Sequence, residues 1–362
     1  MSGPANEALI PTACFACCRL APARNTARQL RRCSLAEDWP MFKVQQTYTT
    51  STTCWLLTAL FLVCAGGCFS AEDSEATDMY HGSIVVDGAS LQYTVEGSGY
   101  TCLIVGSRKF HRQMFSLRFK EHFRCAYGDT RMFTPGALAP PDRPYDLTTM
   151  VEDLEAVRRD LGWERVVVVG HSLFAWVALE YARTYADRTD GVVMIAAPPE
   201  FPGVAAIEAF MDADASVHRQ SIYAEQQKRW EAWLNAAERS PDEQLLLYFV
   251  VHSAIYWYDP EFDSAAFWEG VVWDSGLFNE VLAHSTDYHI ATGPPVITPA
   301  FVAQGRYDYR VPYTLWDAEA KAALERLSFH LFEESGHQPP LEEPDAFDAA
   351  VIRWFDARIG SQ

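Results

Sequence analysis

The sequence predicts an α/β fold, with a mostly parallel sheet flanked by helices and a helical cap inserted between two parts of the sheet. Apolar runs of strand length alternate with helical stretches from residue 101 to 198, and this alternation returns between 294 and 362. Residues 199–293 hold helical, aromatic-rich stretches and no run typical of a buried strand. Because strands that alternate with helices form parallel sheets, we expect one sheet built from two segments of the chain.

The first segment is predicted to open with a hairpin. Two β-rich runs flank Asp87-Gly88, a dipeptide that favours a two-residue hairpin turn. Apolar residues at helical spacing predict a helix over 151–162 that ends at Gly162, and a second helix is expected over 172–186. Short apolar runs predict buried strands at 101–106, 123–129, 165–170 and 191–197.

The second segment is predicted to complete the sheet. We expect in order a strand at 297–305, a helix at 315–327, a strand at 328–334 and a helix at 345–359. The chain therefore divides into a leader (1–68), an acidic linker (69–78), the first part of the core (79–198), a helical cap (199–293) and the second part of the core (294–362).

The leader has the pattern of a secretory signal that starts at Met41. A positive charge at Lys43 precedes an apolar run from Cys54 to Ala65, and small residues then lead into an acidic stretch. The apolar run is shorter than the ~20 residues that span a bilayer. We therefore expect translation to begin at Met41 and the protein to be exported, as a secreted or periplasmic protein or as a membrane-anchored lipoprotein.

The end of the leader resembles a bacterial lipobox, in which a cysteine is lipidated and becomes the mature N-terminus. Cys68 occupies that position, although Ala65 stands where leucine is usual. The resemblance implies membrane attachment through a lipidated Cys68. Two alternatives remain open: an ordinary signal peptide or short signal anchor, and an organelle transit sequence over the arginine-rich residues 1–40.

Charge and cysteine usage exclude several classes of function. Residues 69–362 carry 23 Lys and Arg against 45 Asp and Glu, a net charge of −22, so we expect no nucleic-acid binding. Seven of the nine cysteines precede residue 69, which is not the pattern of a disulfide scaffold. Cys14, Cys17 and Cys18 have the spacing of half a zinc site but no second ligand pair follows, and Gly97-Ser98-Gly99 precedes a strand instead of a helix, so we expect no metal and no cofactor.

Ser172 has the setting of a catalytic nucleophile. It lies where the predicted strand 165–170 meets the helix 172–186, and Gly170 precedes it by two residues. A serine in such a tight strand-to-helix turn adopts a strained backbone and requires small neighbours. The turn raises the hydroxyl above the sheet at a helix N-terminus, where an anionic intermediate is stabilised.

At this point the sequence resembles the α/β-hydrolase family, over residues 80–362. Asp308 follows a predicted strand in GRYDYRVP, and His337 follows the next strand in EESGHQPPLEEP. These positions match the family order Ser…Asp…His, which implies a Ser172 nucleophile, a His337 base and an Asp308 that orients the base. The GHS, GRYD and SGH segments look most like proline iminopeptidases and their relatives. Glu200, where some relatives carry the acid, is the alternative to Asp308.

Two departures from the family pattern concern the oxyanion hole. Phe174 stands where the family usually has glycine, two residues after the nucleophile. Residues 105–109 replace the His-Gly-Gly-Pro-Gly motif, and only Gly106 matches it. Because an oxyanion hole uses backbone N–H groups, it tolerates changes of side chain. We assign it to the N–H groups of Ser107 and Leu173.

The predicted function is hydrolysis of esters or amides of small, largely apolar molecules through an acyl-enzyme. Aromatic residues of the cap, such as Trp257 and Trp268, are expected to line the substrate pocket together with Phe174. One alternative is a proline iminopeptidase, which acts on short peptides and needs cap acids to hold the α-amine: Glu208, Asp212, Glu225, Glu231, Glu261 or Glu269. Another is a catalytically dead, surface-tethered binding protein on a hydrolase scaffold.

Overall fold

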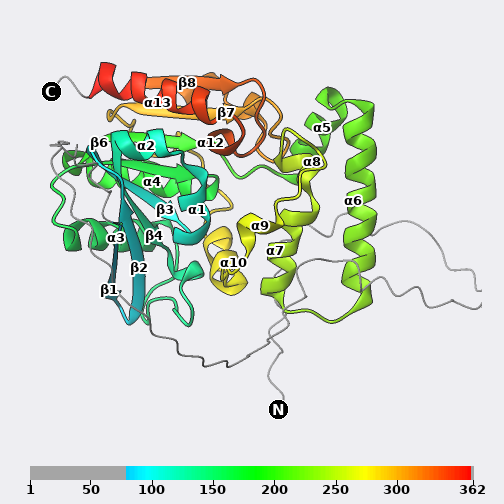
Figure 1. Cartoon of the computed structure of the whole chain (residues 1–362), viewed down its shortest axis with the longest axis horizontal. Helices are drawn as coiled ribbons and strands as arrows, with labels where there is room; N and C mark the ends of the chain where they lie inside the picture. Colours follow the sequence, from blue (N-terminus) through cyan, green and yellow to red (C-terminus); the bar gives the residue numbers. More distant parts are fainter. Residues whose placement is uncertain (1–78, 360–362) are drawn as a thin grey trace, which may run out of the picture. The chain divides into compact units, whose positions relative to one another are not determined.

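The structure of the protein is a computed structural model in which residues 79–359 are described (Figure 1). The predicted leader and acidic linker, with Met41 and Cys68, lie outside the described residues.

The centre of the described structure is an eight-stranded sheet with the order β1-β2-β4-β3-β5-β6-β7-β8. β1 pairs antiparallel with β2, and β2 pairs antiparallel with β4, whereas every other neighbouring pair is parallel. The predicted mostly parallel sheet is therefore confirmed. The strands are β1 Tyr80–Val86, β2 Ala89–Glu96, β3 Tyr100–Gly106, β4 Phe123–Asp129, β5 Val166–His171, β6 Thr189–Ile195, β7 Ala300–Gly305 and β8 Leu327–Phe332.

The hairpin turn lies where the sequence predicts it. Asp87 and Gly88 join β1 to β2, and both have positive φ, at 46° and 80°. Positive φ at both central residues is the requirement of the type I′ turn, whose twist matches that of a hairpin.

Within residues 79–359, seven helices lie before or after the cap: α1 Arg108–Met114, α2 Leu117–His122, α3 Leu147–Asp160, α4 Leu173–Thr184, α11 Ala318–Ala322, α12 Pro339–Glu342 and α13 Pro344–Arg358. Short 3₁₀ turns cover Arg131–Phe133, Ala186–Arg188 and Tyr313–Leu315. Helices α1 and α2 are not among the predicted elements. Their signal is an N-cap serine, since Ser107 and Ser116 accept hydrogen bonds from the N–H groups of Phe110 and Phe119.

The predicted helix 315–327 is wrong in length. Only the five residues of α11 are helical, and the following backbone bonds to another segment instead. Val296 N–H donates to the Ala323 carbonyl, and Glu325 N–H donates to the Val296 carbonyl. This strand-like pairing outweighs the helical propensity of the segment.

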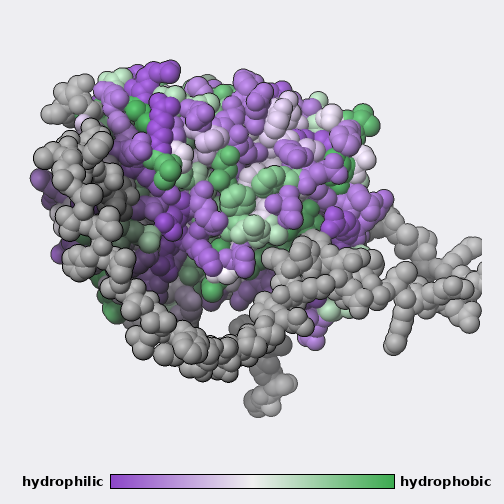
Figure 2. Space-filling view, viewed as in Figure 1, coloured by the Kyte–Doolittle hydropathy of each residue, from purple (hydrophilic) through white to green (hydrophobic). Residues whose placement is uncertain are grey.

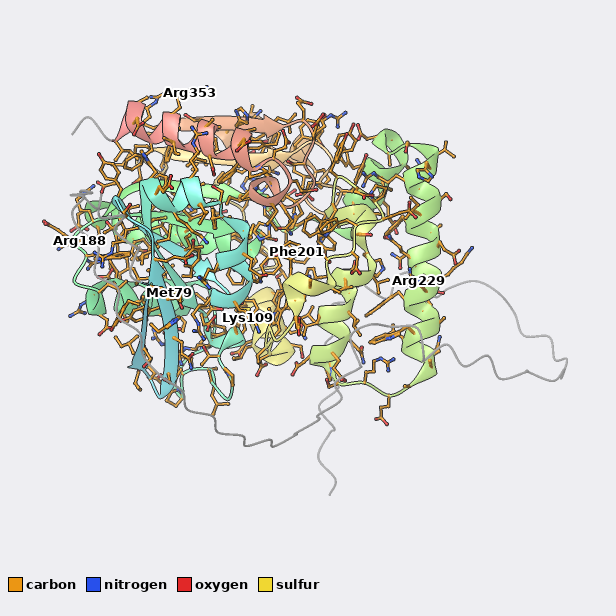
Figure 3. The ribbon with its side chains drawn as sticks, in the orientation of Figure 1. Met79, Lys109, Arg188, Phe201, Arg229 and Arg353 are labelled. Carbon is orange, nitrogen blue, oxygen red and sulfur yellow. The ribbon has the colours of Figure 1, made fainter. Side chains whose placement is uncertain are left out.

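Six helices lie between β6 and β7, and Figure 1 shows them gathered beside the sheet. They are α5 Val204–Asp214, α6 Val217–Ala236, α7 Pro241–Val251, α8 Ser253–Tyr256, α9 Ala265–Trp268 and α10 Ser275–Ala283. Ser240 and Glu243 form a capping box that starts α7. Lys109 of α1, labelled in Figure 3, packs against Gly270, two residues after the end of α9, so the cap contacts the core there.

The core centres on β5 and β6, whose Val166–Val169 and Val192–Ile195 are at most 2% exposed. Helix α4 covers these strands with side chains that are buried along most of its length. Hydrophilic residues predominate on the face seen in Figure 2, with smaller apolar groups between them. No helix within residues 79–359 is both long and apolar enough to cross a membrane.

Candidate active site

The chain between β5 and α4 forms a strained elbow at Ser172. Ser172 has φ 57° and ψ −126°, and only two other non-glycine residues in the range 79–359, Asp87 and Ala196, have positive φ. Such a backbone costs about 1–3 kcal/mol and persists only where its surroundings impose it. The Ser172 N–H donates to the carbonyl of Ile195 at the end of β6 over 2.8 Å, which fixes the turn against the neighbouring strand.

The close approach at the elbow explains the glycine at 170 and the phenylalanine at 174. A Cβ on Gly170 would lie 2.7 Å from the Cα of Ala175 and closer still to the carbonyl group of Phe174. Position 170 therefore requires glycine. The Phe174 side chain instead packs on the rings of Phe133 and His111, with ring centroids 5.7 and 5.6 Å apart. This packing accommodates the departure from the family pattern.

Asp308 and His337 meet although 29 residues separate them. Asp308 follows β7, His337 follows β8, and Oδ2 of the acid lies 2.7 Å from Nδ1 of the imidazole. The other carboxylate oxygen of Asp308 accepts the N–H of Val311 over 2.8 Å. Asp308 is fully buried and His337 is 4% exposed. The pair therefore has the geometry of a base held in one tautomer by an acid.

Burial sets the protonation of this pair. It lowers the pKa of His337 to about 3, and the positive charge of Arg310 acts in the same direction. Burial also raises the pKa of Asp308 well above its usual value, an effect that the N–H of Val311 partly opposes. A neutral imidazole at neutral pH can accept a proton, as a general base must.

The cap contributes directly to the placement of both residues. The N–H of His337 donates to the Tyr256 carbonyl over 2.6 Å. The N–H groups of Tyr309 and Arg310, directly after Asp308, donate to the Ile255 carbonyl. Two adjacent carbonyls of α8 therefore hold two loops: the acid loop, which follows β7 and contains Asp308, and the histidine loop, which follows β8 and contains His337.

Glu342 organises the histidine loop from the other side. One of its carboxylate oxygens accepts the N–H groups of Gly336 and Gln338, which flank His337, over 2.9 and 3.1 Å. The other accepts the N–H of Tyr258 in the cap over 2.6 Å. Burial raises the pKa of Glu342 to about 7, although these N–H groups oppose the shift. Its only sequence signal is its place in EESGHQPPLEEP.

Glu200 does not reach His337 through any contact of the described structure. Its side chain is exposed, and its backbone forms a bridge with His289. The geometry favours Asp308 as the acid.

Two further histidines lie at the elbow. His171 directly precedes Ser172, and its Nε2 lies 2.8 Å from the carbonyl oxygen of His337. His111, on α1, contacts the rings of His171 and Phe174. His111 is not among the residues predicted from the sequence, because a lone histidine on an unpredicted helix carries no motif.

The predicted oxyanion donors differ in their surroundings. The N–H of Leu173 belongs to the first residue of α4, where helix geometry leaves an N–H without an intrahelical partner. The N–H of Ser107 donates to Nδ1 of His111 over 2.8 Å. The N–H of Ser107 therefore already has an acceptor in this structure, the His111 imidazole.

Aromatic rings extend from His337 into the cap. The Tyr256 ring lies 5.4 Å from that of His337, and Phe249 links Tyr256 to Trp268 and Trp273. Of the predicted pocket residues, Trp268 belongs to this set. Phe174 packs on Phe133, whose ring in turn contacts Trp273. The Trp257 ring packs on Phe262 and Phe267, in a cluster that also contains Tyr256.

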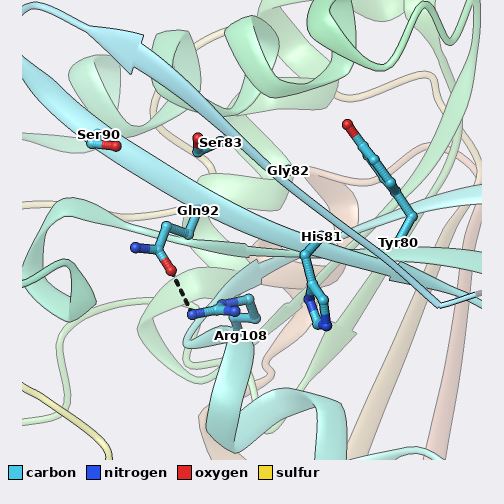
Figure 4. A pocket seen from close by; sticks show the side chains of 7 residues that line it. All are labelled: Tyr80, His81, Gly82, Ser83, Ser90, Gln92 and Arg108. Carbon is cyan, nitrogen blue, oxygen red and sulfur yellow. Dashed lines mark hydrogen bonds between the residues drawn. The ribbon is translucent and has the colours of Figure 1, made fainter.

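Two further features of the described structure do not include Ser172, Asp308 or His337. A shallow pocket along the first hairpin is lined by Tyr80, His81, Gly82, Ser83, Ser90, Gln92 and Arg108 (Figure 4). Cys102 and Cys125 face each other across β3 and β4 as free, buried thiols. Burial raises the pKa of the Cys102 thiol, which makes it a poor nucleophile.

Comparison with known proteins identifies the family. Residues 110–350 match the model of the alpha/beta hydrolase family, and a curated relative shares 30% identity over 276 residues. The chain belongs to the alpha/beta hydrolase family. The relative is the AB hydrolase superfamily protein YclE of Bacillus subtilis (strain 168), and the alignment covers 75% of this chain and 96% of YclE. The match confirms the resemblance read from the sequence and makes the protein a hydrolase by family.

Solved structures agree on the alpha/beta hydrolase fold. A proline iminopeptidase-related protein from Thermus thermophilus has a TM-score of 0.58 at 20% identity, covering 79% of this chain and all of that one. An esterase from Exiguobacterium antarcticum has a TM-score of 0.54 at 20% identity, covering 74% of this chain and 96% of that one. At these identities the likeness shows the fold alone.

Proposed function

We propose that this hydrolase is a serine hydrolase that cleaves esters or amides of small, largely apolar molecules. The observation that supports it most is the 2.7 Å contact between His337 and Asp308, together with a serine held at positive φ in a strand-to-helix elbow whose preceding residue, His171, bonds to the His337 carbonyl. A nucleophile in an elbow, a neutral base and a buried acid are the three parts that acyl transfer requires.

In the proposed reaction the Oγ of Ser172 attacks the substrate carbonyl carbon while its proton passes to Nε2 of His337. The carbonyl oxygen becomes an oxyanion, bound by the Leu173 N–H at the head of α4. Collapse of this intermediate breaks the bond to the leaving group, which takes the proton from His337. Water, deprotonated by His337, then releases the acyl group and restores Ser172.

The aromatic rings near His337 support an apolar substrate. Phe249 stacks with Trp273 at a centroid distance of 5.0 Å and contacts Tyr256, which contacts His337. Rings of this kind favour apolar groups and leave few polar partners for a charged one.

A proline iminopeptidase activity is the weaker alternative. It requires an acid in the cap that binds the free α-amine of a peptide inside the site. The six acids considered for that role, Glu208, Asp212, Glu225, Glu231, Glu261 and Glu269, are all solvent-exposed. A surface carboxylate provides little binding energy for an amine. Comparing kcat/KM for p-nitrophenyl acetate and for prolyl-β-naphthylamide distinguishes the two activities.

Labelling with a fluorophosphonate tests the proposal, because only an activated serine reacts with this probe. We expect the wild type to be labelled and to hydrolyse p-nitrophenyl esters, and Ser172→Ala to do neither while keeping the wild-type melting temperature. Ser221→Ala, at an exposed position of α6, is the matched control and should behave as wild type. An unlabelled, inactive wild type would instead support a binding protein on a hydrolase scaffold.

We also propose that the protein is exported through the signal that begins at Met41, with its mature N-terminus at or near Cys68. The order of charge, apolar run and small residues supports this. The intact mass of protein made in its native host tests it. A lipid adduct on Cys68 would support membrane attachment, and a mature chain that keeps residues 1–40 would contradict the proposal.

A further inference from the structure

Most backbone N–H groups that follow β3 already donate hydrogen bonds to acceptors within the protein. The Ser107 N–H donates to Nδ1 of His111 over 2.8 Å, and the Arg108 N–H donates to Oδ1 of Asp129 over 2.6 Å. The N–H groups of Phe110 and His111 donate to the side chain and carbonyl of Ser107. An oxyanion needs at least one strong donor besides the N–H that follows the nucleophile, so the second donor has to be found elsewhere.

The contact with Ser107 determines the tautomer of His111. Nδ1 also lies 3.1 Å from the Ser107 carbonyl oxygen, but one nitrogen cannot donate to that oxygen and accept the N–H together. The N–H contact is the shorter, so Nδ1 is the acceptor and the proton resides on Nε2. Burial, with the neighbouring His171, lowers the pKa of His111 to about 3, so the ring is neutral.

Nε2 of His111 is a buried donor without a partner. The residue is 3% exposed, and among residues 79–359 nothing accepts a hydrogen bond from this nitrogen. An unpaired buried donor costs about 1–3 kcal/mol, and such groups in native structures call for an explanation. A ligand that accepts the hydrogen bond during turnover is one explanation.

The position of the ring supports that explanation. A Cβ on Gly106, at the end of β3, would lie 2.6 Å from Nδ1 of His111, so the imidazole occupies the space beside this strand end. The same ring meets His171 and Phe174 edge-on, at 5.7 and 5.6 Å between centroids. These two residues flank Ser172 and Leu173 in the sequence. The imidazole therefore lies between the end of β3 and the head of α4, where an oxyanion hole forms.

We propose that His111 is a catalytic hydrogen-bond donor, whose Nε2–H joins the Leu173 N–H in binding the oxyanion that forms when Ser172 attacks an acyl substrate. This inference rests on the proposed function. No proton leaves His111 in the step: Oγ bonds to the carbonyl carbon, its proton passes to His337, and the negative carbonyl oxygen accepts the Nε2–H. A neutral imidazole is suited to this role because its N–H can donate a hydrogen bond to the oxyanion and keep its proton.

Two substitutions test the proposal in the full-length protein. In His111→Phe the ring remains and the donor is lost, and we expect kcat for p-nitrophenyl acetate to fall by about 10²–10³-fold with KM nearly unchanged. Fluorophosphonate labelling should slow to a similar degree, because the phosphoryl oxygen takes the place of the oxyanion. His111→Gln keeps an N–H donor and should recover part of the loss.

His252→Phe is the matched control. His252 is a fully buried cap residue whose Nε2 also has no partner in the described structure, but its ring contacts are with Tyr223, Trp230 and Tyr248. A kcat for His111→Phe close to that of the wild type, or a loss matched by His252→Phe, would overturn the proposal. Wild-type activity that is lost in Ser172→Ala but kept in His111→Phe would overturn this inference alone and leave the proposed function intact.

If His111→Phe does not fold, a crystal structure of the wild type phosphonylated by the same probe decides the question. We expect the phosphoryl oxygen about 3 Å from Nε2 of His111, a hydrogen-bond distance. An oxygen bound only by backbone N–H groups, with Nε2 of His111 beyond hydrogen-bond reach, would overturn the proposal.

Discussion

Replacing Gly305 by alanine should move the histidine loop, and with it His337, away from Asp308. Gly305 is the last residue of β7, three residues before Asp308, and the histidine loop passes directly over it. A Cβ at this position would lie 2.5 Å from the Ser335 carbonyl oxygen, 2.7 Å from the Gly336 carbonyl carbon and closer still to the Gly336 carbonyl oxygen. All three atoms belong to backbone, so no side chain can rotate away from the added methyl group.

The size of the effect follows from these distances. Carbon and carbonyl oxygen approach to about 3.3 Å in comfortable contacts, so the loop has to move by about 1 Å or more. His337 follows Gly336 directly, and its 2.7 Å contact with Asp308 would lengthen accordingly. A displacement of about 1 Å at a catalytic group costs on the order of 10²-fold in rate. Overpacking of this kind also lowers the free energy of unfolding by about 1–3 kcal/mol.

The assay compares kcat/KM for p-nitrophenyl acetate, the rate of fluorophosphonate labelling and the melting temperature. Gly128→Ala, in the second-last position of β4, is the matched control. Nothing lies within 4 Å of a Cβ at Gly128, and its φ is not positive, so this variant should be as stable and active as the wild type. Equal kcat/KM and melting temperature for the two variants would refute the reasoning.

Three further predictions concern the triad and the core. Asp308→Asn should keep the fold and lower kcat by up to about 10⁴-fold, because the amide stabilises the wrong tautomer of His337; a mild loss would contradict this. Because burial lowers the pKa of His337 to about 3, the acid limb of a kcat/KM–pH profile should lie below 6.5, the ordinary histidine value, and a limb above pH 7 would argue against a buried neutral base. Because the pKa of His337 is lower in the folded than in the unfolded chain, protonation of His337 favours the unfolded chain. The folded state is therefore more stable above pH 6.5, and this stability is lost as the pH falls from 6.5 toward about 3. Asp153→Ala should lower the free energy of unfolding by about 3–5 kcal/mol in urea titrations, since it leaves the fully buried Arg131 without the carboxylate that it contacts twice at 2.8 Å; an unchanged midpoint would contradict it.

The local signals in the sequence were sufficient for most of the fold. The apolar runs gave β3 to β8 to within a few residues, and the Asp87-Gly88 turn gave the first hairpin. The helix over 315–327 failed because residues 323–325 bond to Val296, a partner that lies before β7 and that no local pattern reveals. Helices α1 and α2 were missed because each has at most seven residues, too few to show a period.

The candidate site, like the fold, is predictable from the sequence in part. Ser172 could be predicted from the sequence, because the glycine of a strand-to-helix elbow lies two residues away and both elements have clear periodicity. Asp308 and His337 could be predicted because each follows its own strand, and parallel strands bring their carboxyl ends to one edge. The sequence alone thus determined the sheet, the elbow and the order in which Ser172, Asp308 and His337 follow their strands.

Only the tertiary structure decided what surrounds them. It gave Trp257 and Trp268 different ring partners, Phe262 and Phe249, although both are aromatic residues of the same cap. It also brought the α8 carbonyls to the histidine loop and directed the Ser107 N–H to His111. The reason is physical: a motif fixes a residue's own turn through local backbone sterics, whereas the partner of a buried N–H or ring depends on which distant segments pack within a few ångströms of it.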